Sequence, residues 1–211
     1  MDTTPIVIVP GFGCVERAAD IAGATFTVEV TRPLAADARA AAAEDAEAVL
    51  AALGEAGVAR VDLRTAGLDV QPAWDHEGNR PVRRGFTVTH RIAATVRDLE
   101  AVGRVVDAGL ASGATGLDGV EFRLGDEGPA AEEARRLAVL DARTRAGIIA
   151  EAAGRRLGAL RSLCEGGAAG SPSPRHEGRM MAMAADTITP VLPGRIAVAV
   201  SVVGEWELAD G

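Results

Sequence analysis

Soft-metal ligands gather in one short segment of the chain, the sequence HEGRMMAM. It contains His176, Met180, Met181 and Met183, and imidazole and thioether groups are ligands that suit Cu(I). Residues 166–187, which include this segment, are rich in Gly, Ser, Pro and Ala and show no apolar periodicity, so we predict a mobile loop there. The loop is the main interpretation, and soft-metal (copper) binding by a small-ligand or stress protein is the alternative.

Two other groups of polar residues have side chains that bind metals in proteins. Asp75, His76 and Glu77 are consecutive, but they fall in a predicted hairpin turn, and divalent sites usually draw their ligands from separate elements. His90 lies on the apolar face of a predicted strand, with no other His or Cys close to it in the sequence. We therefore predict that its imidazole packs in the core and hydrogen-bonds to a neighbour.

The motifs of common enzyme classes are missing from the sequence. It has no Gly-x-Ser-x-Gly, Walker or His-Glu-x-x-His motif, and the opening GFGCVE lacks the third glycine of a dinucleotide fingerprint. Cys14 and Cys164 are far apart and match no metal-ligand spacing. We therefore expect a non-enzymatic protein with no catalytic residues and no cofactor.

Length and composition narrow the class of protein further. A chain of 211 residues with 48% hydrophobic content can bury one sizeable core, and its formal charge of −8 argues against nucleic-acid binding, which needs a basic surface. No apolar run approaches the roughly 18 residues of a membrane span, and the opening MDTTPIVIVPGFG lacks the basic start of a signal peptide. We therefore predict a cytoplasmic protein with reduced thiols.

The elements that would position these residues alternate between strands and helices. Residues 22–31 alternate apolar and polar side chains, as in a half-buried strand, and helical spacing follows from Pro33 to Gly57. A long hairpin at 58–96, with a bulge near Gly67, precedes a second helix and a further strand. The order over residues 22–125 is β-α-β-β-α-β, that of a ferredoxin-like split βαβ unit.

A long helix and a closing strand are predicted to extend this core. Small alanines recur every four residues in the segment that we predict as a helix over 129–163, and residues 195–208 alternate as an unusually long strand. Because almost every strand alternates, we expect a largely antiparallel sheet with helices on one face. The prediction is one α+β domain over residues 1–211.

Several short motifs are spread along most of the chain. In chain order, they are Gly11 and Gly13 of GFG, ADIA at 19–22, Gly85-Phe86, DAGLASGA at 107–114, EAR at 133–135, DAR at 141–143, Gly154, Leu157 and Gly158, and TPVLPG at 189–194. Together these motifs resemble the SIMPL domain family, which includes bacterial periplasmic immunogenic proteins. The chain departs from the family pattern at Ala19, where Pro is usual, and at Phe86, where Tyr is usual. Many members also carry an export signal.

The resemblance implies an α+β fold, self-assembly into rings or channel-like oligomers in some members, and an association with stress tolerance or signalling. It implies no established catalytic residues. The motif residues Arg135, Asp141 and Arg143 are the ones that most suggest a site. Helical spacing lets Asp141 pair with Arg145 or lie against a neighbouring element, so we interpret the charged motif residues as structural or interface ion pairs.

The predicted strands also indicate how the chain assembles. The hairpin at 58–96 and the closing strand exceed the usual five or six residues, so their ends should project beyond the helices and leave backbone groups unpaired. Pairing with a second copy would cover these edges and bury Leu68, Val70 and Trp206. We therefore expect a homo-oligomer, ring-like in form, that is held partly by the hairpin.

Overall fold

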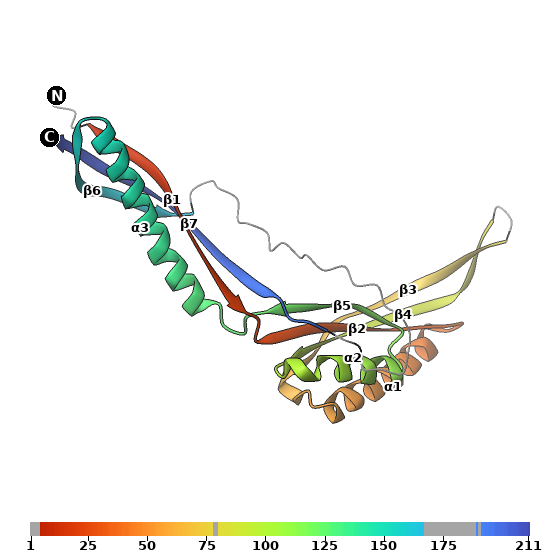
Figure 1. The fold of residues 1–211 in the computed structure, drawn as a ribbon. Helices are drawn as coiled ribbons and strands as arrows, with labels where there is room; N and C mark the ends of the chain where they lie inside the picture. The colour runs from red at the N-terminus through yellow and green to blue at the C-terminus, as the bar shows by residue number, and fades with distance from the viewer. Residues whose placement is uncertain (1–4, 78–79, 167–188, 190) are drawn as a thin grey trace. The chain divides into compact units, whose positions relative to one another are not determined.

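The chain divides into two compact units, each with its own antiparallel sheet (Figure 1). The computed structural model describes residues 5–77, 80–166, 189 and 191–211. We call Met1–Ala18, Asp126–Met181 and Arg195–Gly211 unit 1, and Ala19–Gly125 with Ala182–Gly194 unit 2. The α+β class predicted from the sequence is confirmed, with two sheets in place of one.

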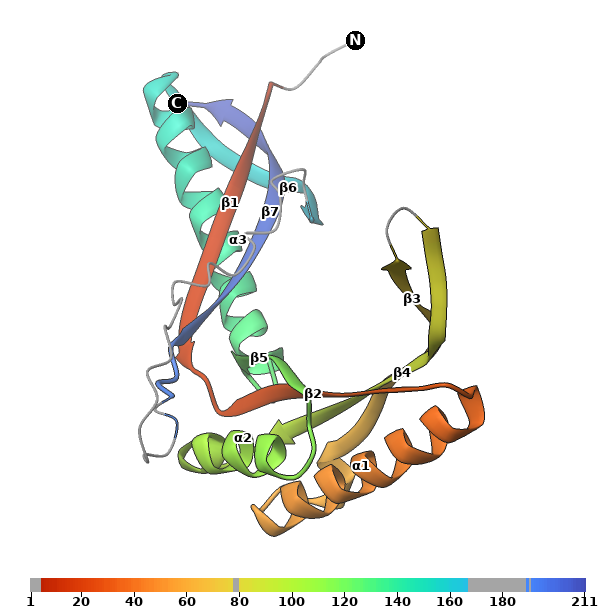
Figure 2. The same ribbon diagram turned by 90° about the vertical axis from the view of Figure 1, so that its right-hand side faces the viewer.

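Unit 2 contains the predicted β-α-β-β-α-β order. Its elements are β2 (Ile21–Arg32), α1 (Ala35–Glu55), β3 (Leu63–Glu77), β4 (Arg80–Val96), α2 (Val102–Ala111) and β5 (Gly116–Arg123), with short 3-10 turns at Arg60–Asp62 and Leu99–Ala101. The strand order is β3-β4-β2-β5, and every neighbouring pair is antiparallel. Both ribbon views show α1 and α2 on the same face of this sheet (Figures 1 and 2).

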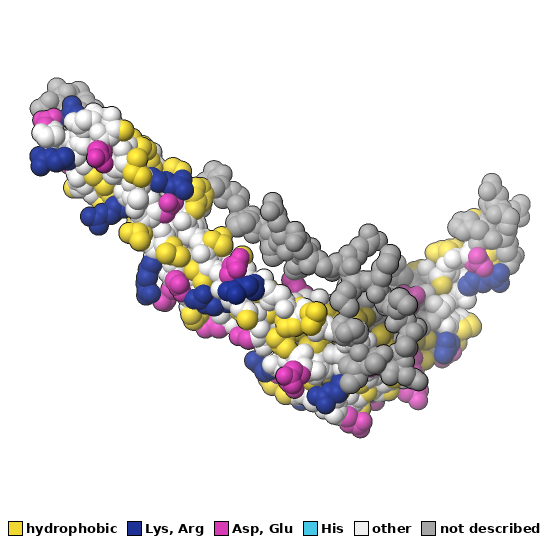
Figure 3. All heavy atoms as spheres, viewed as in Figure 1, with side chains coloured by type: hydrophobic (Ala, Val, Ile, Leu, Met, Phe, Trp, Pro, Cys, Tyr) yellow, Lys and Arg dark blue, Asp and Glu magenta, His cyan; other side chains and the backbone are white. Residues whose placement is uncertain are grey.

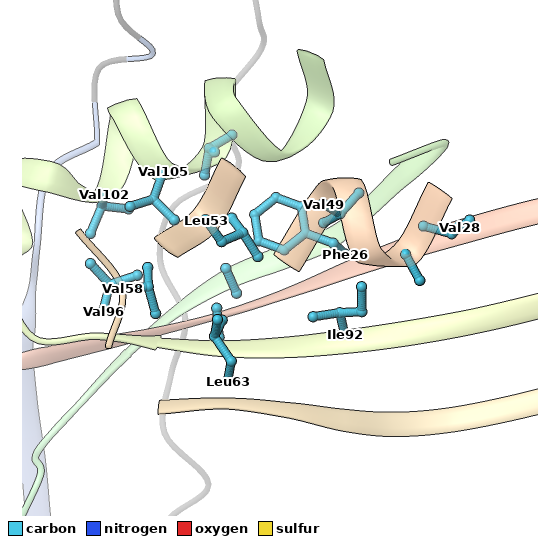
Figure 4. Packing of buried hydrophobic residues seen from close by; sticks show 14 of the residues in the cluster. Phe26, Val28, Val49, Leu53, Val58, Leu63, Ile92, Val96, Val102 and Val105 are labelled. Carbon is cyan, nitrogen blue, oxygen red and sulfur yellow. The ribbon is translucent and has the colours of Figure 1, made fainter. Parts of the chain in front are cut away.

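Large aliphatic and aromatic side chains fill the space between this sheet and its helices (Figure 4). Phe26 of β2 is fully buried, and a Cβ at Gly109 of α2 would collide with its ring. Leu53, Ile92 and Val102 are also fully buried. The unit therefore has a well-filled core of the kind that stabilises a small α+β fold.

The predicted bulge near Gly67 is confirmed. The β3–β4 register shifts between Thr65 and Gly67, so Leu63 before the bulge and Val70 after it face the same side of the sheet. That side is the helix-covered one, because Val70 pairs with the buried Val88.

Unit 1 is a three-stranded sheet covered by one helix. It consists of β1 (Ile6–Ala18), α3 (Gly128–Ala152), β6 (Arg155–Glu165) and β7 (Arg195–Asp210), with the strand order β1-β7-β6. The buried residues of α3 are all alanines, one every four residues from Ala130 to Ala150. They pack against the sheet together with Val7, Val9, Val202 and Trp206.

The predicted helix over 129–163 is too long. The helix ends at Ala152, because Gly154 adopts a left-handed conformation with φ of 68°, and the following residues form β6. Leu157, Leu160 and Leu163 are three apart, a spacing that also occurs along one face of a helix. Register irregularities in β6 place all three opposite successive residues of one face of β7, so the spacing comes from bulges in a strand.

The first strand of the fold was missing from the sequence prediction. Val7, Val9, Gly11, Gly13 and Val15 alternate as the buried face of β1, but the glycines and Pro10 conceal that pattern. The closing strand pairs with β1 and β6 and so does not extend the sheet of unit 2.

Two further features bear on the predictions. The predicted mobile loop at 166–187 lies outside the described residues except for Gly166. Within the described residues, no helix is both long and apolar enough to cross a membrane.

Candidate functional site

The GFG motif of β1 and the alanines of α3 form one packing unit. A Cβ at Gly11 would collide with the carbonyl oxygen of Ala138, and a Cβ at Gly13 would collide with that of Ala134. Two glycines opposite an alanine stripe therefore let the helix backbone lie directly on the strand. Phe12, between the glycines, turns its side chain to the exposed face.

Asp141 connects this helix to the edge of the sheet. Its carboxylate accepts a hydrogen bond from the backbone N–H of Phe12 at 2.9 Å and pairs with Arg145 at 2.9 Å. The Phe12 N–H, aided by the hydrogen bond from Arg145, lowers the pKa of Asp141. The Arg145 guanidinium also lies over the Phe12 ring, 5.4 Å from its centroid. Asp141 therefore pairs locally with Arg145 and also lies against a neighbouring strand, the two arrangements that the sequence left open.

The middle of the β1 edge is closed to strand pairing. The Leu208 N–H donates to the Pro5 carbonyl at 2.8 Å, so odd-numbered residues of β1 bond to β7 and even-numbered ones turn their backbone groups outward. Of these, Pro10 has no N–H and Phe12 donates to Asp141. Proline on the strand and charged side chains at its edge are known means of protecting an edge strand.

An apolar hollow lies beside this protected edge. It has a volume of about 280 Å³ and is lined by Val9, Pro10, Arg145, Ile148 and Ile149. The lining holds no nucleophile and no acid or base that titrates near neutral pH. Its chemistry therefore suits an apolar or aromatic group, which Arg145 can contact through its guanidinium face.

The other charged motif residues of α3 lie on its flanks. Arg135 bonds to Glu165 of β6 at 2.9 Å, and Glu133 pairs with Arg17 of β1. Arg143 is exposed. The Arg135 pair and the Asp141 contacts tie α3 to two different strands of its sheet.

Motif residues of unit 2 likewise make structural contacts. The Asp107 carboxylate accepts hydrogen bonds from the hydroxyl and the N–H of Thr189, at 2.7 and 3.3 Å. Asp20 accepts one from the Gly125 N–H at 2.6 Å, and a Cβ at Gly85 would collide with the Arg32 carbonyl. These motif residues therefore lie where one segment of the backbone is hydrogen-bonded to another segment or packed closely against it.

The hairpin carries an uncovered apolar strip on the helix side of β3. Leu68, Val70 and Trp74 are 57%, 46% and 60% exposed, and we call them the β3 strip. Trp206, which the sequence analysis grouped with Leu68 and Val70, is only 4% exposed and packs in the core of unit 1. Its indole lies where a Cβ at Gly204 would be, so its own chain already buries it.

No metal site is found among the described residues: they contain no group of three or more His, Cys, Asp or Glu that could hold an ion. His90 is half-buried on the apolar face, and its Nε2 lies 3.3 Å from the Thr65 hydroxyl. Asp75 pairs with Arg84 at 3.3 Å. The side chains of His76 and Glu77, and the segment with His176, Met180, Met181 and Met183, lie outside the described residues.

The two cysteines are exposed and too far apart for a disulfide. Cys14 is opposite Ala199 of β7 and Cys164 is opposite Val203, on the other side of the same strand. Four residues of strand separate the two positions by about 13 Å. A disulfide needs Cα atoms within about 7 Å, so geometry keeps these thiols apart in any compartment.

Sequence reasoning missed Pro10, Phe12, Ile148 and Trp74 as surface residues of interest. Ile148 lies beside the alanine stripe of α3 in the sequence, yet it is 63% exposed. The one signal available was Pro10 directly before a Gly-x-Gly in an apolar run, which is typical of an edge strand rather than a central one.

The fold and its contacts define an α+β protein whose motif residues hold helices and strands together. A family model, SIMPL, described as a protein of unknown function, matches residues 7–206, and the chain belongs to this family. The 26 kDa periplasmic immunogenic protein of Brucella abortus (strain S19) is 32% identical over 213 residues, which cover 96% of this chain and 84% of that protein.

A second relative is the uncharacterized protein YggE of Escherichia coli (strain K12). It is 25% identical over 159 residues, which cover 75% of this chain and 65% of that protein. The name of the Brucella protein places that protein in the periplasm, so the comparison does not support the cytoplasmic location expected from the N-terminal sequence.

Proposed function

We propose that this SIMPL protein is non-enzymatic and acts by assembling with copies of itself into a ring-like homo-oligomer. The observation that carries the proposal is the β3 strip: Leu68, Val70 and Trp74 are large apolar residues on the helix side of an edge strand, and each is about half exposed or more. Contiguous exposed apolar side chains are typical of surfaces that bind another protein.

The contacts of the charged motif residues support a structural role for the motifs. Asp107 holds Thr189, whose hydroxyl donates to its carboxylate, and Asp141 and Arg135 hold α3 to strands of its sheet. The described partners of Asp141 and Arg135 are the Phe12 N–H, Arg145 and Glu165, which include no nucleophile paired with a base. Catalysis by acyl or phosphoryl transfer needs such groups within hydrogen-bond reach of each other. We therefore propose no catalytic activity.

The physiological setting of the assembly is a further part of the proposal. The family resemblance implies a link to stress tolerance, and the Brucella relative is named as periplasmic. We propose a stress-related role, and the periplasm rather than the cytoplasm as the compartment. Subcellular fractionation of the native host, with an antibody to this chain, tests the compartment, and recovery with cytoplasmic markers would contradict it.

Size-exclusion chromatography with light scattering tests self-association. The wild-type protein at micromolar concentration should have a mass several times the 21.6 kDa of one chain. The double variant Leu68→Asp/Val70→Asp should lower that mass, because two carboxylates would be buried without partners.

The matched control is Gln71→Asp. Gln71 and Asp69 lie on the opposite face of β3, so this variant carries two acids at the same spacing on the face without the strip. It should assemble like the wild type. A monomeric wild type, or equal loss of assembly in both variants, would contradict the proposal.

A further inference from the structure

A histidine lies directly beside the β3 strip. His90 of β4 is opposite Leu68 of the strip, and the next residue on the same face of β4, Val88, is opposite Val70. Leu68 and Val70 are about half exposed, whereas Val88 and Ile92, on either side of His90 along this face, are fully buried. The half-buried imidazole therefore lies at the boundary between the strip and the core of unit 2.

The two strands beside β4 surround His90 with uncharged groups. On β3 these are Leu68, directly opposite, and the Thr65 hydroxyl, 3.3 Å from Nε2. On β2 the residue opposite is Val28, which is fully buried. Because side chains alternate along a strand, Arg91 of β4 lies on the other face of the sheet. The described acidic side chains of β2 and β3 also lie on that other face: Glu29, Asp69 and Asp75.

Helix α1, which packs on β4 and β2 from the same side, presents no carboxylate on its flank toward β3. At 3.6 residues per turn, Asp45 lies on the flank toward α2, where Gly113 approaches it, and Arg39 lies on the opposite flank. The other acids of α1 are exposed on its outer side: Asp37, Glu44, Glu47 and Glu55. A guanidinium on the β3 flank opposes a second positive charge at His90.

A second copy that covered the strip would bury the imidazole as well. His90 lies between Leu68 of the strip and the buried Val28, so covering Leu68 removes much of the exposure that His90 retains. Loss of water disfavours the charged form of a histidine unless a carboxylate or other acceptors compensate. The Thr65 hydroxyl accepts one hydrogen bond, whereas an imidazolium has two N–H donors. Protonation of His90 therefore costs more in the assembled form than in the free chain.

We propose that His90 is a pH switch for self-association: the assembly forms with a neutral imidazole and dissociates when His90 gains a proton. This inference rests on the proposed function, because it names the regulation of the same β3 strip. By linkage, a group that is harder to protonate in the assembled form favours assembly at neutral pH, and that contribution is lost as the pH falls. Histidine is the side chain that ordinarily changes charge between pH 5 and 8, where most carboxylates stay ionised.

Light scattering coupled to size exclusion, from pH 7 to pH 5 at constant ionic strength, tests the switch. The mass of the wild type at micromolar concentration should fall toward the 21.6 kDa of one chain. The association constant of a contact should drop by up to about tenfold per pH unit for each His90 that it buries. His90→Gln keeps a neutral hydrogen-bonding side chain and should assemble equally at both pH values. Far-UV circular dichroism at pH 5 checks that every variant remains folded.

A double variant, His76→Gln/His176→Gln, provides the matched control. It leaves His90 as the single histidine of the chain and should keep the full response to pH. Because position 90 is unchanged, this variant decides the question even where His90→Gln does not assemble at pH 7.

The outcomes separate the switch from the proposed function. A monomeric wild type at pH 7 would overturn both. An oligomer with the same mass at pH 7 and pH 5 would overturn the switch alone, as would an equal response to pH in His90→Gln. Loss of the response in His76→Gln/His176→Gln would also overturn it, because another histidine would then be responsible.

Discussion

Both units pack helix against an antiparallel sheet, but the side chains between the two layers are large in unit 2 and small in unit 1. In unit 2, Phe26, Leu53 and Ile92 fill the space between the layers (Figure 4). In unit 1, α3 buries only alanines, and Gly11 and Gly13 face them from β1. Close backbone approach thus replaces large side chains at one of the two interfaces.

This difference in packing determines which large apolar residues are exposed to solvent. Because alanines occupy the buried side of α3, its large apolar residues Leu140 and Ile148 are exposed, and hydrophobic and charged side chains lie interspersed over the surface (Figure 3). Ile8 and Phe12 are exposed on β1 in the same way. Unit 1 therefore exposes large apolar side chains because of its packing, whereas unit 2 places most of its large residues in its core.

The largest effect should come from emptying the core of unit 2. Phe26→Ala removes a fully buried ring that fills the space above Gly109, and the cavity should lower the free energy of unfolding by about 3–5 kcal/mol. Urea unfolding followed by far-UV circular dichroism measures the loss. Thr25→Ala, one residue away on the opposite face, should cost less than about 1 kcal/mol. Equal losses in both variants would refute the assignment of this core.

In unit 1, one methyl group added between β1 and α3 should lower the free energy of unfolding. Gly13→Ala places a Cβ against the carbonyl oxygen of Ala134, so α3 must shift from β1, at a cost of about 1–3 kcal/mol. Gly147→Ala in α3 meets no described atom within 4 Å and should instead stabilise the helix by up to about 1 kcal/mol. Unfolding followed by tryptophan fluorescence in a Trp74→Phe background, in which Trp206 is the remaining tryptophan, reports on this unit. A neutral Gly13→Ala would contradict the close packing.

A smaller, pH-dependent effect should follow from Asp141→Asn. The pKa of Asp141 is lowered in the folded state, so its carboxylate stabilises the fold above the unfolded-state pKa, and this contribution is lost as pH falls through the folded pKa. At pH 7 the variant should be less stable by about 1 kcal/mol, the usual net value of one hydrogen bond. The difference from the wild type should shrink below about pH 4.

Asp62 provides the comparison in unit 2. Two hydrogen bonds from Arg97, at 2.7 and 2.8 Å, lower its pKa, so Asp62→Asn should show the same direction of pH dependence. Urea midpoints between pH 3 and 7 for both variants test the two sites together. A difference from the wild type that grew toward acid pH would contradict either assignment.

The smallest effect is expected from the cysteines. Cys14 and Cys164 should both react with iodoacetamide in the native, non-reduced protein, because both are exposed and β7 lies between their strands. Intact-mass measurement should show two added groups, with no change in stability. A disulfide within one chain would contradict the register of the unit 1 sheet. Reactive thiols would not identify the compartment, since geometry alone prevents this bond.

Much of unit 2 could be predicted from the sequence, and much less of unit 1. The strand at 22–31, the long hairpin and the bulge near Gly67 all follow from apolar alternation, which works where large side chains fill a core. In β1 the buried positions include Gly11 and Gly13, which carry no hydrophobic signal. In β6, Leu157 and Leu160 have helical spacing because of irregular pairing.

The candidate site likewise contains some contacts that the sequence predicts and others that it does not. The pairing of Asp141 with Arg145 follows from helical spacing, and the exposed positions of Leu68 and Val70 agree with strands that extend beyond their helices. The contact of Asp141 with the Phe12 N–H joins residues 129 positions apart, which no local pattern encodes. Trp206 is a different case. Alternation along residues 195–208 indicates that it lies on the apolar face of its strand, but not whether that face packs in the core of its own chain or against another copy.

By itself, the sequence determined the α+β class, the β-α-β-β-α-β order of unit 2 and the alanine stripe of α3, because these depend on side-chain type and local period. The family followed from the resemblance of its short motifs. Only the tertiary structure decided that the closing strand belongs to a second sheet, and that α3 lies on two glycines of β1. It also decided which apolar residues face solvent. The physical reason is that burial depends on which backbones approach each other, and in unit 1 the residues that allow the closest approach have almost no side chain.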